Sequence, residues 1–179
     1  MDIELEMLGT AAETLCADQM PFEEIVGRHS GMVYSIALRF LGDSGLAEDV
    51  AQEAFLRLSM NLKHIKSETH MALWLRRVAA RLCIDEQRKF RKRFVPLEST
   101  PEPHSNDISE DFLELERIRA LVAELPEKTR MTLILRFQEA LSPPEIAHTL
   151  GTSLNSIKSR LRRGLATLRE RLGHTKEIN

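Results

Sequence analysis

Apolar residues recur at steps of three and four along most of the chain, which is the spacing of one face of an α-helix. The clearest stripe lies in residues 151–173 and consists of Leu154, Ile157, Leu161, Leu165, Leu168 and Leu172. Another ends at Gly42 and consists of Val26, Met32, Val33, Ile36, Ala37 and Phe40. The alternating pattern of a β-strand is absent from the sequence, so we predict an all-α fold.

Capping residues and loss of periodicity predict the boundaries of the central helices. Asp43 or Ser44 is suited to cap a helix over GLAEDVAQEAFLRLSMN, because a short polar side chain can accept a hydrogen bond from the free N–H groups of the first turn. The segment 63–70, KHIKSETH, has no periodicity and is predicted to be a loop. A long helix is predicted to begin near Met71 and to end in a basic cluster.

Residues 95–112 are acidic and rich in proline, and they show no helical stripe. We predict a flexible linker there, and a coil of about 18 residues has an average end-to-end distance of roughly 23 Å. The acidic linker joins two small helical domains, residues 22–94 and 113–173. An acidic N-terminal extension, 1–21, and a short tail, 174–179, complete the predicted organisation.

The segment LSPPEIAHTLGTSLNSIKSRL has the features of a helix-turn-helix. Ser142 is suited to cap the first helix, and Pro143 stands at the first helical position, where its missing N–H costs nothing. The small Ala147 stands where the two helices would cross, and Gly151 can adopt the left-handed conformation of the turn. Ile157 is the apolar anchor of the second helix, whose N-terminal part enters the major groove in such motifs.

The distribution of charge favours a nucleic-acid binder. The whole chain has a formal net charge of -2. Residues 1–24 and 95–112 nevertheless carry only acids, whereas 25–94 and 113–179 are each net positive. Two basic blocks separated by an acidic spacer are typical of nucleic-acid binding with a tether. The alternative for the last helix is a solvated charged face, but only Glu170 interrupts its positive charges.

Polar and basic side chains of the turn and second helix are the candidates for contact with DNA. Lysine and arginine can bind guanine edges, serine and asparagine are adaptable donors, and most positive charges contact phosphate only. The candidates are Thr152, Asn155, Ser156, Lys158, Ser159, Arg160, Arg162 and Arg163.

Catalytic, metal-binding and membrane-spanning patterns are absent from the sequence. It contains no glycine-rich nucleotide loop and no H-E-x-x-H, and its six histidines are scattered. Cys16 and Cys83 lack a C-x-x-C partner and suit a reducing cytosol. The apolar runs are too short to cross a bilayer, and the acidic N-terminus is unlike a signal peptide. We therefore expect a cytoplasmic protein that is not an enzyme and that uses no cofactor or metal.

Two blocks of the chain resemble bacterial sigma factors of the extracytoplasmic-function group. The first is FEEIVGRHSGMVYSIALRFLGDSGLAEDVAQEAFLRL followed by ALWLRRVAARLCIDEQRKFRKR, and the second is LPEKTRMTLILRFQEALSPPEIAHTLGTSLNSIKSRLRRGLATLRERL. The resemblance covers roughly residues 22–94 and 113–172. It implies a protein that binds core RNA polymerase and directs promoter recognition and transcription initiation. The alternative is a stand-alone helix-turn-helix regulator with an N-terminal sensing domain, which would bind its operator without polymerase.

The resemblance also implies the partners. In that group the AEDVAQEAF helix docks on the clamp helices of the largest polymerase subunit, which implies this role for Glu48, Asp49, Gln52 and Glu53. The second domain would contact the flap of the second-largest subunit and the minus-thirty-five promoter element. An anti-sigma factor is the further partner implied. The acidic linker would thread the RNA path of the polymerase, whereas its residues alone require no more than a tether.

The long basic helix and the loop before it would open the minus-ten element and hold its bases and phosphates. The implied contacts are Lys63, His64, Lys66, Trp74, Arg76, Arg77, Arg81, Arg88 and Lys92. Trp74 is a candidate for base stacking, with a place in the core as the alternative. The family commonly has Asn where this chain has Arg81, so the resemblance implies strand binding there but no specific base contact.

Overall fold

The computed structural model describes residues 20–93 and 110–176. Within these ranges the side chains of residues 90–93, 110–113 and 174–176 are left out of the description. The predicted N-terminal extension, most of the linker and the end of the tail lie outside the described residues. The described ranges are helical and contain no strand, which confirms the predicted all-α class.

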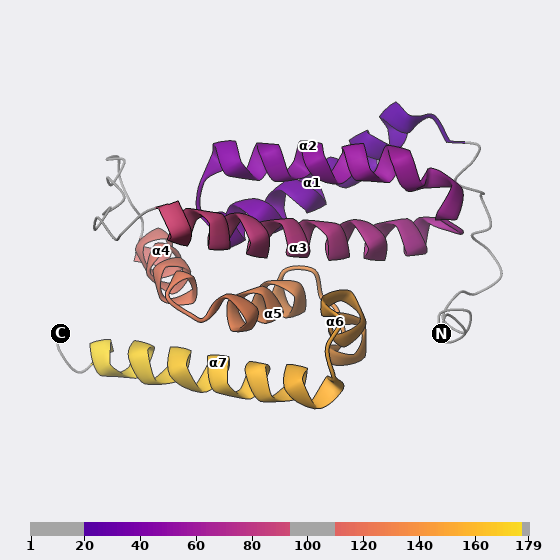
Figure 1. Cartoon of the computed structure of the whole chain (residues 1–179). Coiled ribbons are helices and arrows are strands. Elements are labelled where there is room, and N and C mark those ends of the chain that lie inside the picture. Colours follow the sequence, from indigo (N-terminus) through magenta and orange to yellow (C-terminus); the bar gives the residue numbers. More distant parts are fainter. Residues whose placement is uncertain (1–19, 94–109, 177–179) are drawn as a thin grey trace.

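The first unit is a bundle of three helices, α1 (Phe22–Leu41), α2 (Ser44–Asn61) and α3 (Glu68–Arg93), which all pack on one another (Figure 1). A short 3-10 helix, η2 (Leu62–His64), follows α2. Its most deeply buried residues, at most 1% exposed, include Ile25, Val33, Ile36, Phe40, Leu58 and Leu75. Burying each such side chain stabilises the fold by about 1.5–3 kcal/mol relative to exposure.

The turn between α1 and α2 follows the sequence prediction. Gly42 ends α1 in the left-handed conformation with φ 73, and its N–H donates to the Leu38 carbonyl over 2.8 Å. Of the two residues suited to cap α2, Asp43 does so, because its Oδ1 accepts a 2.8 Å hydrogen bond from the Leu46 N–H.

The prediction that residues 63–70 form a loop and that a helix begins near Met71 is wrong at both ends. Leu62–His64 form η2, and α3 begins at Glu68. Ser67 caps α3, since its Oγ accepts from the His70 N–H over 3.1 Å and its carbonyl accepts from the Met71 N–H over 2.9 Å. The apolar stripe starts later than the helix because the first turn of α3 lies at the surface.

The second unit consists of α4 (Glu110–Ala123), α5 (Glu127–Phe137), α6 (Pro143–Leu150) and α7 (Leu154–Lys176). α4 begins inside the predicted linker, so the last residues of that segment are helical. α7 packs against the other three helices, and the core includes the fully buried Met131, Leu135, Ile146 and Ile157. Gly164 permits the close approach of α7 to α5, because a Cβ there would lie 2.8 Å from Cγ2 of Thr129.

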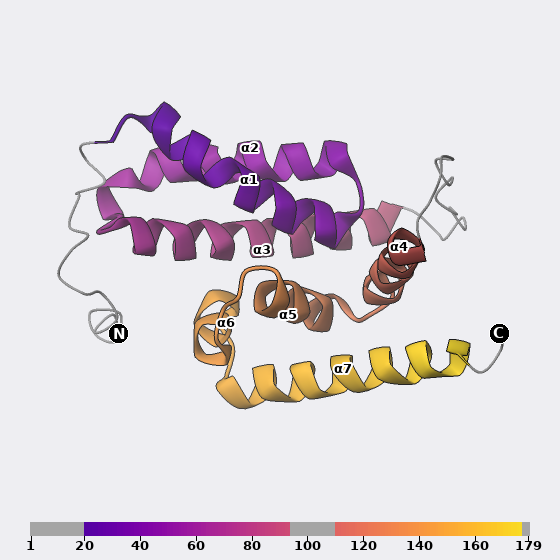
Figure 2. The same cartoon turned by 180° about the vertical axis from the view of Figure 1, so that it is seen from behind.

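The two units pack against each other, a contact that the sequence analysis did not predict. α3 packs on α5 and α6, and α1 packs on α5. Figures 1 and 2 show α5 and α6 directly beneath α3 from opposite sides. All residues from Arg130 to Leu135 are buried, because α5 has α7 on one side and the first unit on the other. The packing of α5, α6 and the segment between them on α3 therefore determines which side chains of α3 are accessible.

Candidate nucleic-acid interface

The helix-turn-helix is formed by α6 and α7, and its local geometry is well defined. Ser142 and Glu145 form a capping box: the Ser142 N–H donates to Glu145 Oε2 over 2.7 Å and the Glu145 N–H donates to Ser142 Oγ over 3.5 Å. The Ser142 hydroxyl also donates to Glu145 Oε2 over 2.5 Å, and this hydrogen bond, together with the one from the Ser142 N–H, lowers the pKa of the Glu145 carboxyl. Gly151 has φ 60, and Ser153 caps α7 by accepting from the Ser156 N–H over 3.2 Å. The predicted motif is confirmed by its cap and its turn.

The N-terminal half of α7 presents a polar face to solvent. Ile157 is buried in the core of the second unit. Asn155, Lys158 and Arg162 are exposed at helical spacing on the other side of α7. Arg163 is exposed as well, and Thr152, Ser156, Ser159 and Arg160 are half-buried. The candidate residues therefore do not form one uniform patch. Asn155, Lys158 and Arg162 share the exposed face at helical spacing and are called the leading residues of α7, and the other five lie at the margin of that face.

The predicted apolar stripe of α7 is wrong at its first residue. Leu161, Leu165, Leu168 and Leu172 are half-buried, but Leu154 is 36% exposed. It is the first residue of α7 and stands next to Asn155. An exposed apolar side chain there is suited to contact a thymine methyl group. Sequence analysis missed this candidate because the stripe assigned Leu154 to the core.

The outward face of α2 combines acids with large apolar side chains. Glu48, Asp49 and Gln52 are exposed, and the Glu53 carboxylate pairs with Arg57 at 2.8 Å. The same face continues with two exposed apolar residues. Leu56 is 55% exposed and Met60 is 79% exposed. Such side chains beside polar groups are typical of a protein-docking surface. The sequence analysis missed both, although their spacing from Asp49 and Gln52 places them on one face.

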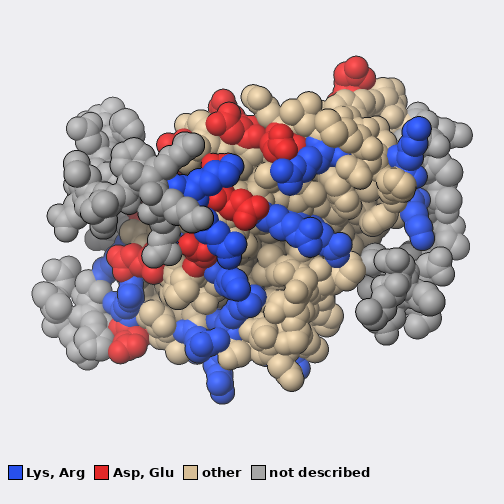
Figure 3. All heavy atoms as spheres, viewed as in Figure 1, with Lys and Arg blue, Asp and Glu red and all other residues tan. Residues whose placement is uncertain are grey.

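The basic candidates near the start and end of α3 are exposed. Lys63, His64 and Lys66 are exposed around η2, where Ile65 is buried and anchors the segment to the core. Arg81 and Arg88 are exposed along α3. Arg88 also lies 3.8 Å from the Glu127 carboxylate. Lys92 belongs to the last turn of α3, and its side chain lies outside the described residues. Figure 3 shows lysine and arginine side chains across one face of the molecule, from the level of α3 to that of α7.

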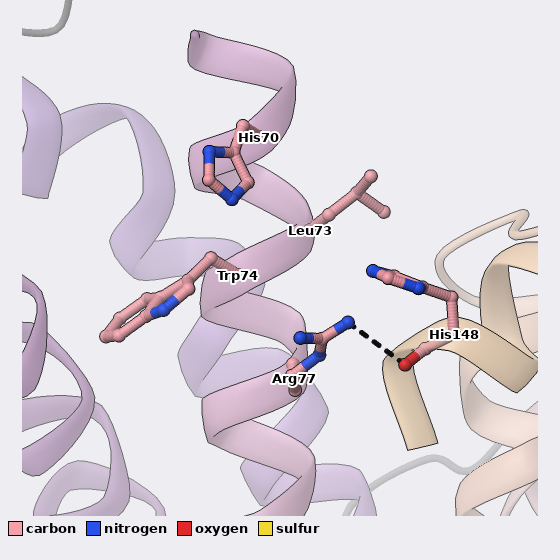
Figure 4. A pocket seen from close by; sticks show the side chains of 5 residues that line it. All are labelled: His70, Leu73, Trp74, Arg77 and His148. Atoms are coloured by element: carbon pink, nitrogen blue, oxygen red, sulfur yellow. Dashed lines mark hydrogen bonds between the residues drawn. The ribbon is translucent and has the colours of Figure 1, made fainter. Parts of the chain in front are cut away.

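Two other candidates on α3, Arg76 and Arg77, contact the second unit. Arg76 pairs with Glu139 at 2.9 Å, and Arg77 donates to the His148 carbonyl over 3.1 Å. Trp74 is half-buried and packs on the core. It lines a small pocket with His70, Leu73, Arg77 and His148 (Figure 4). Burial lowers the pKa of Arg77, and the nearby Arg81 lowers it further. The structure therefore divides the candidates on α3 into an exposed and a covered group.

Two histidines near this contact have lowered pKa values. Burial lowers the pKa of His29, and the charges of Arg76 and Arg28 act in the same direction against the charge of Glu68. Burial also lowers the pKa of His70, and the nearby Lys66, Arg77 and His148 reinforce the effect. The His70 Nδ1 accepts a 3.1 Å hydrogen bond from the Lys66 N–H. Both histidines are therefore favoured in their neutral form.

The described residues offer little else for chemistry. No group of three or more His, Cys, Asp or Glu side chains among them is placed to hold a metal ion. None of the described helices has the length and hydropathy needed to cross a bilayer. Cys83 is buried, which raises the pKa of its thiol to about 12 and keeps it protonated and unreactive near neutral pH.

Comparison with known proteins agrees with this arrangement. The sequence models of Sigma-70 region 2 and of Sigma-70, region 4 match residues 25–94 and 115–168. The chain is 32% identical to the ECF RNA polymerase sigma factor SigE of Mycolicibacterium smegmatis, over 96% of this chain and 71% of that protein. It is 29% identical to SigW of Bacillus subtilis, over 87% of this chain and 90% of that protein.

Two solved structures have a similar fold. The sigma factor RpoE, in complex with the anti-sigma factor NepR from Bartonella quintana, matches with a TM-score of 0.70 and 20% identity, over 85% of this chain and 96% of that one. CnrH, in complex with the cytosolic domain of CnrY, matches with a TM-score of 0.65 and 23% identity, over 89% of this chain and 93% of that one.

An all-α fold, a helix-turn-helix with an exposed basic face and two matched sigma-70 regions define a regulatory DNA-recognition protein rather than an enzyme. The chain belongs to the extracytoplasmic-function (ECF) family of RNA polymerase sigma factors. It is a promoter-directing subunit that acts with core RNA polymerase, and the alternative of a stand-alone regulator is not favoured.

Proposed function

We propose that the chain recruits core polymerase through α2 and contacts two promoter elements with α3 and α7. The proposal is carried by one observation: the acidic and apolar face of α2 and the basic face of α7 are both exposed on a chain that both sigma-70 regions match. We assign the two domains to residues 22–94 and 113–173, with 95–112 as the linker and with 1–21 and 174–179 outside the domains.

The α2 face is the proposed docking surface for the clamp helices of the largest polymerase subunit. Glu48, Asp49, Gln52 and Glu53 would orient the contact, because complementary charges steer and align protein partners. Leu56 and Met60 would supply apolar area, since both are exposed in the free chain and would leave water on docking. The docking surface therefore comprises these six residues.

The minus-ten element is assigned to α3 and the segment before it. Lys63, His64 and Lys66 would surround an unstacked base, and Arg81, Arg88 and Lys92 would follow the strand phosphates. α3 has 26 residues and is therefore about 39 Å long. Arg76 and Arg77 would join this surface once the second unit moves away from them, and Trp74, which packs on the core, stays a candidate for base stacking.

The minus-thirty-five element is assigned to the start of α7. Asn155, Lys158 and Arg162 would lie nearest the base edges, with Leu154 against a thymine methyl group. The marginal candidates would hold the DNA backbone and fix the register of the helix in the groove. These are Thr152, Ser156, Ser159, Arg160 and Arg163.

The further partners are also proposals. RpoE and CnrH were solved with NepR and with the cytosolic domain of CnrY, respectively, and we propose that an anti-sigma protein restrains this chain as well. The second domain would contact the flap of the second-largest subunit, and the acidic linker would follow the RNA path. We propose that the chain directs transcription in the cytoplasm, where the polymerase works.

Dependence on core enzyme tests the proposed function. A single helix-turn-helix that neutralises about six phosphates gives a salt slope near −5 and weak binding at physiological salt. The isolated chain should therefore bind duplex promoter DNA weakly, and strand opening, followed by permanganate reactivity of unpaired thymines, should require core polymerase. Tight and selective binding by the isolated chain as a dimer would instead identify a stand-alone regulator.

A further inference from the structure

The N-terminal half of α7 is basic, and no acid of its own sequence balances the charge. Residues 151–168 contain four basic residues and no carboxylate, and Glu170 is the first acid along the helix. None of the four makes an ion pair with a carboxylate of the described residues. They are Lys158, Arg160, Arg162 and Arg163. The start of α7 is therefore a basic surface open to an anion.

The other basic surfaces differ from α7 because carboxylates lie among their positive charges. On α3 the Arg88 guanidinium lies 4.0 Å from the Asp85 carboxylate and 3.8 Å from that of Glu127. The basic segment 63–66 is followed by Glu68 in the first turn of α3. An acidic segment of the same chain should therefore be attracted most strongly to the start of α7, where the positive charge is unopposed.

The N-terminal extension supplies such an acidic segment. Residues 1–19 contain five acids and no lysine, arginine or histidine. In the stretch DIELEM the acids alternate with apolar residues, and this combination suits a basic surface beside the exposed side chain of Leu154. The five acids are Asp2, Glu4, Glu6, Glu13 and Asp18.

The position of α1 places residues 1–19 within reach of α7. Arg28, in the second turn of α1, pairs with Glu68 at the start of α3 over 3.2 Å. Further along α3, Arg77 donates to the His148 carbonyl of α6 over 3.1 Å. Both views show that α1 begins toward the end of the molecule where α6 meets α7 (Figures 1 and 2). A segment of this length spans up to roughly 60 Å, and a compact chain of about 140 residues is only roughly 40 Å across.

We propose that residues 1–19 dock on the start of α7 and compete there with duplex DNA. Carboxylates and phosphates bind the same ammonium and guanidinium donors, so the acids would replace DNA phosphates on Lys158, Arg162 and Arg163. Because the extension belongs to the same chain, its effective concentration is of roughly millimolar order. It would exclude duplex that α7 binds by charge alone, whereas a promoter that the polymerase also holds would displace it. The competition rests on the proposed function of α7, but the docking does not.

Neutralisation of the five acids in the full chain tests the competition with DNA. The matched control neutralises the five acids of the linker and therefore has the same net charge. Affinity for a short fluorescent duplex of arbitrary sequence is measured for both variants, and thermal unfolding verifies that both are folded. The first variant carries Asp2→Asn, Glu4→Gln, Glu6→Gln, Glu13→Gln and Asp18→Asn, and the control carries Glu98→Gln, Glu102→Gln, Asp107→Asn, Glu110→Gln and Asp111→Asn.

At low salt the N-terminal variant should bind duplex about tenfold more tightly than the linker control. A tenfold gain corresponds to an effective concentration about ten times the intrinsic dissociation constant of the extension. The difference should shrink as salt is added, because salt screens exposed charges. Equal affinities of the two variants would overturn the competition. Tighter binding by the linker control would assign the competing segment to the linker and would also overturn the proposal.

Carbodiimide cross-linking of the unmodified chain tests the docking itself, because this reagent joins a carboxylate to an amine that is in contact with it. Lys158 is the only lysine between Lys128 and Lys176. In the monomeric product, peptides from residues 1–19 should be joined to Lys158, and excess duplex should suppress this product. Absence of that link, links to Lys63 or Lys66 in its place, or cross-linked dimers would overturn the proposal. If the unmodified chain supports no core-dependent transcription, the proposed function fails, and the link to Lys158 still decides whether the extension docks.

Discussion

Charge reversal on the outward face of α2, Asp49→Lys with Glu53→Lys, is expected to abolish transcription. The expected cause is a loss of affinity for core polymerase of about a hundredfold or more, because like charges brought together in an interface cost several kcal/mol. The fold should survive, since both carboxylates point away from the core. Within α2 the Glu53→Lys change replaces the ion pair with Arg57 by a repulsion between like charges, and the two effects together cost only about 0.4–1 kcal/mol.

The matched control reverses two acids on α4, Glu114→Lys with Glu116→Lys. Both are exposed, and Glu116 pairs with Arg119 within its helix, much as Glu53 pairs with Arg57. Affinity for labelled core enzyme and thermal unfolding are measured for both double variants. A folded α2 variant that retains normal affinity for core polymerase would show that this face is not the docking surface.

Substitution of the leading residues of α7 should change promoter preference at the upstream element. Arg162→Ala or Lys158→Ala should cost about 1–3 kcal/mol and relax preference at one base pair if the side chain contacts that base, and should weaken all sequences alike if it contacts phosphate. Arg169→Ala is the control, because it removes the same charge from the same helix, about 22 Å further along its axis from Leu154. It should leave base preference unchanged.

The same libraries separate the two DNA-binding surfaces. Substitution of Lys63, His64 or Lys66 by alanine should alter preference at the downstream element and leave the upstream one unchanged. Transcription is scored on libraries randomised at one element at a time. The assignment of α7 to the upstream element and of residues 63–66 to the downstream element would be contradicted by either of two results. One is an α7 variant that changes only downstream preference, and the other is a variant of the 63–66 segment that changes upstream preference.

Features fixed by neighbouring residues were predictable from the sequence. Ser142, Asp43 and Gly151 all have the local geometry that their residue types favour, because a cap or turn depends on atoms a few residues away. The start of α3 was missed for a related reason: its cap, Ser67, precedes a turn that carries no apolar stripe. Hydrophobic periodicity detects the packed part of a helix and not its exposed first turn.

The contact between the units was beyond the reach of sequence reasoning. Arg76 and Glu139 are separated by 63 positions, and nothing local selects this acid among the many in the chain. The exposure of Leu56, Met60 and Leu154 was missed because a leucine or methionine at helical spacing is normally assigned to the core. Residue type and spacing located the candidate surfaces, and only the tertiary packing showed which of their members are accessible.

Transcription from a promoter library by core polymerase, with and without this chain, tests the central claim most directly. Core enzyme alone should give background RNA without promoter preference. With the chain added, RNA should arise from the subset of templates that share an upstream and a downstream element at fixed spacing. RNA that shows no dependence on the chain, or no shared elements among the active templates, would contradict the account.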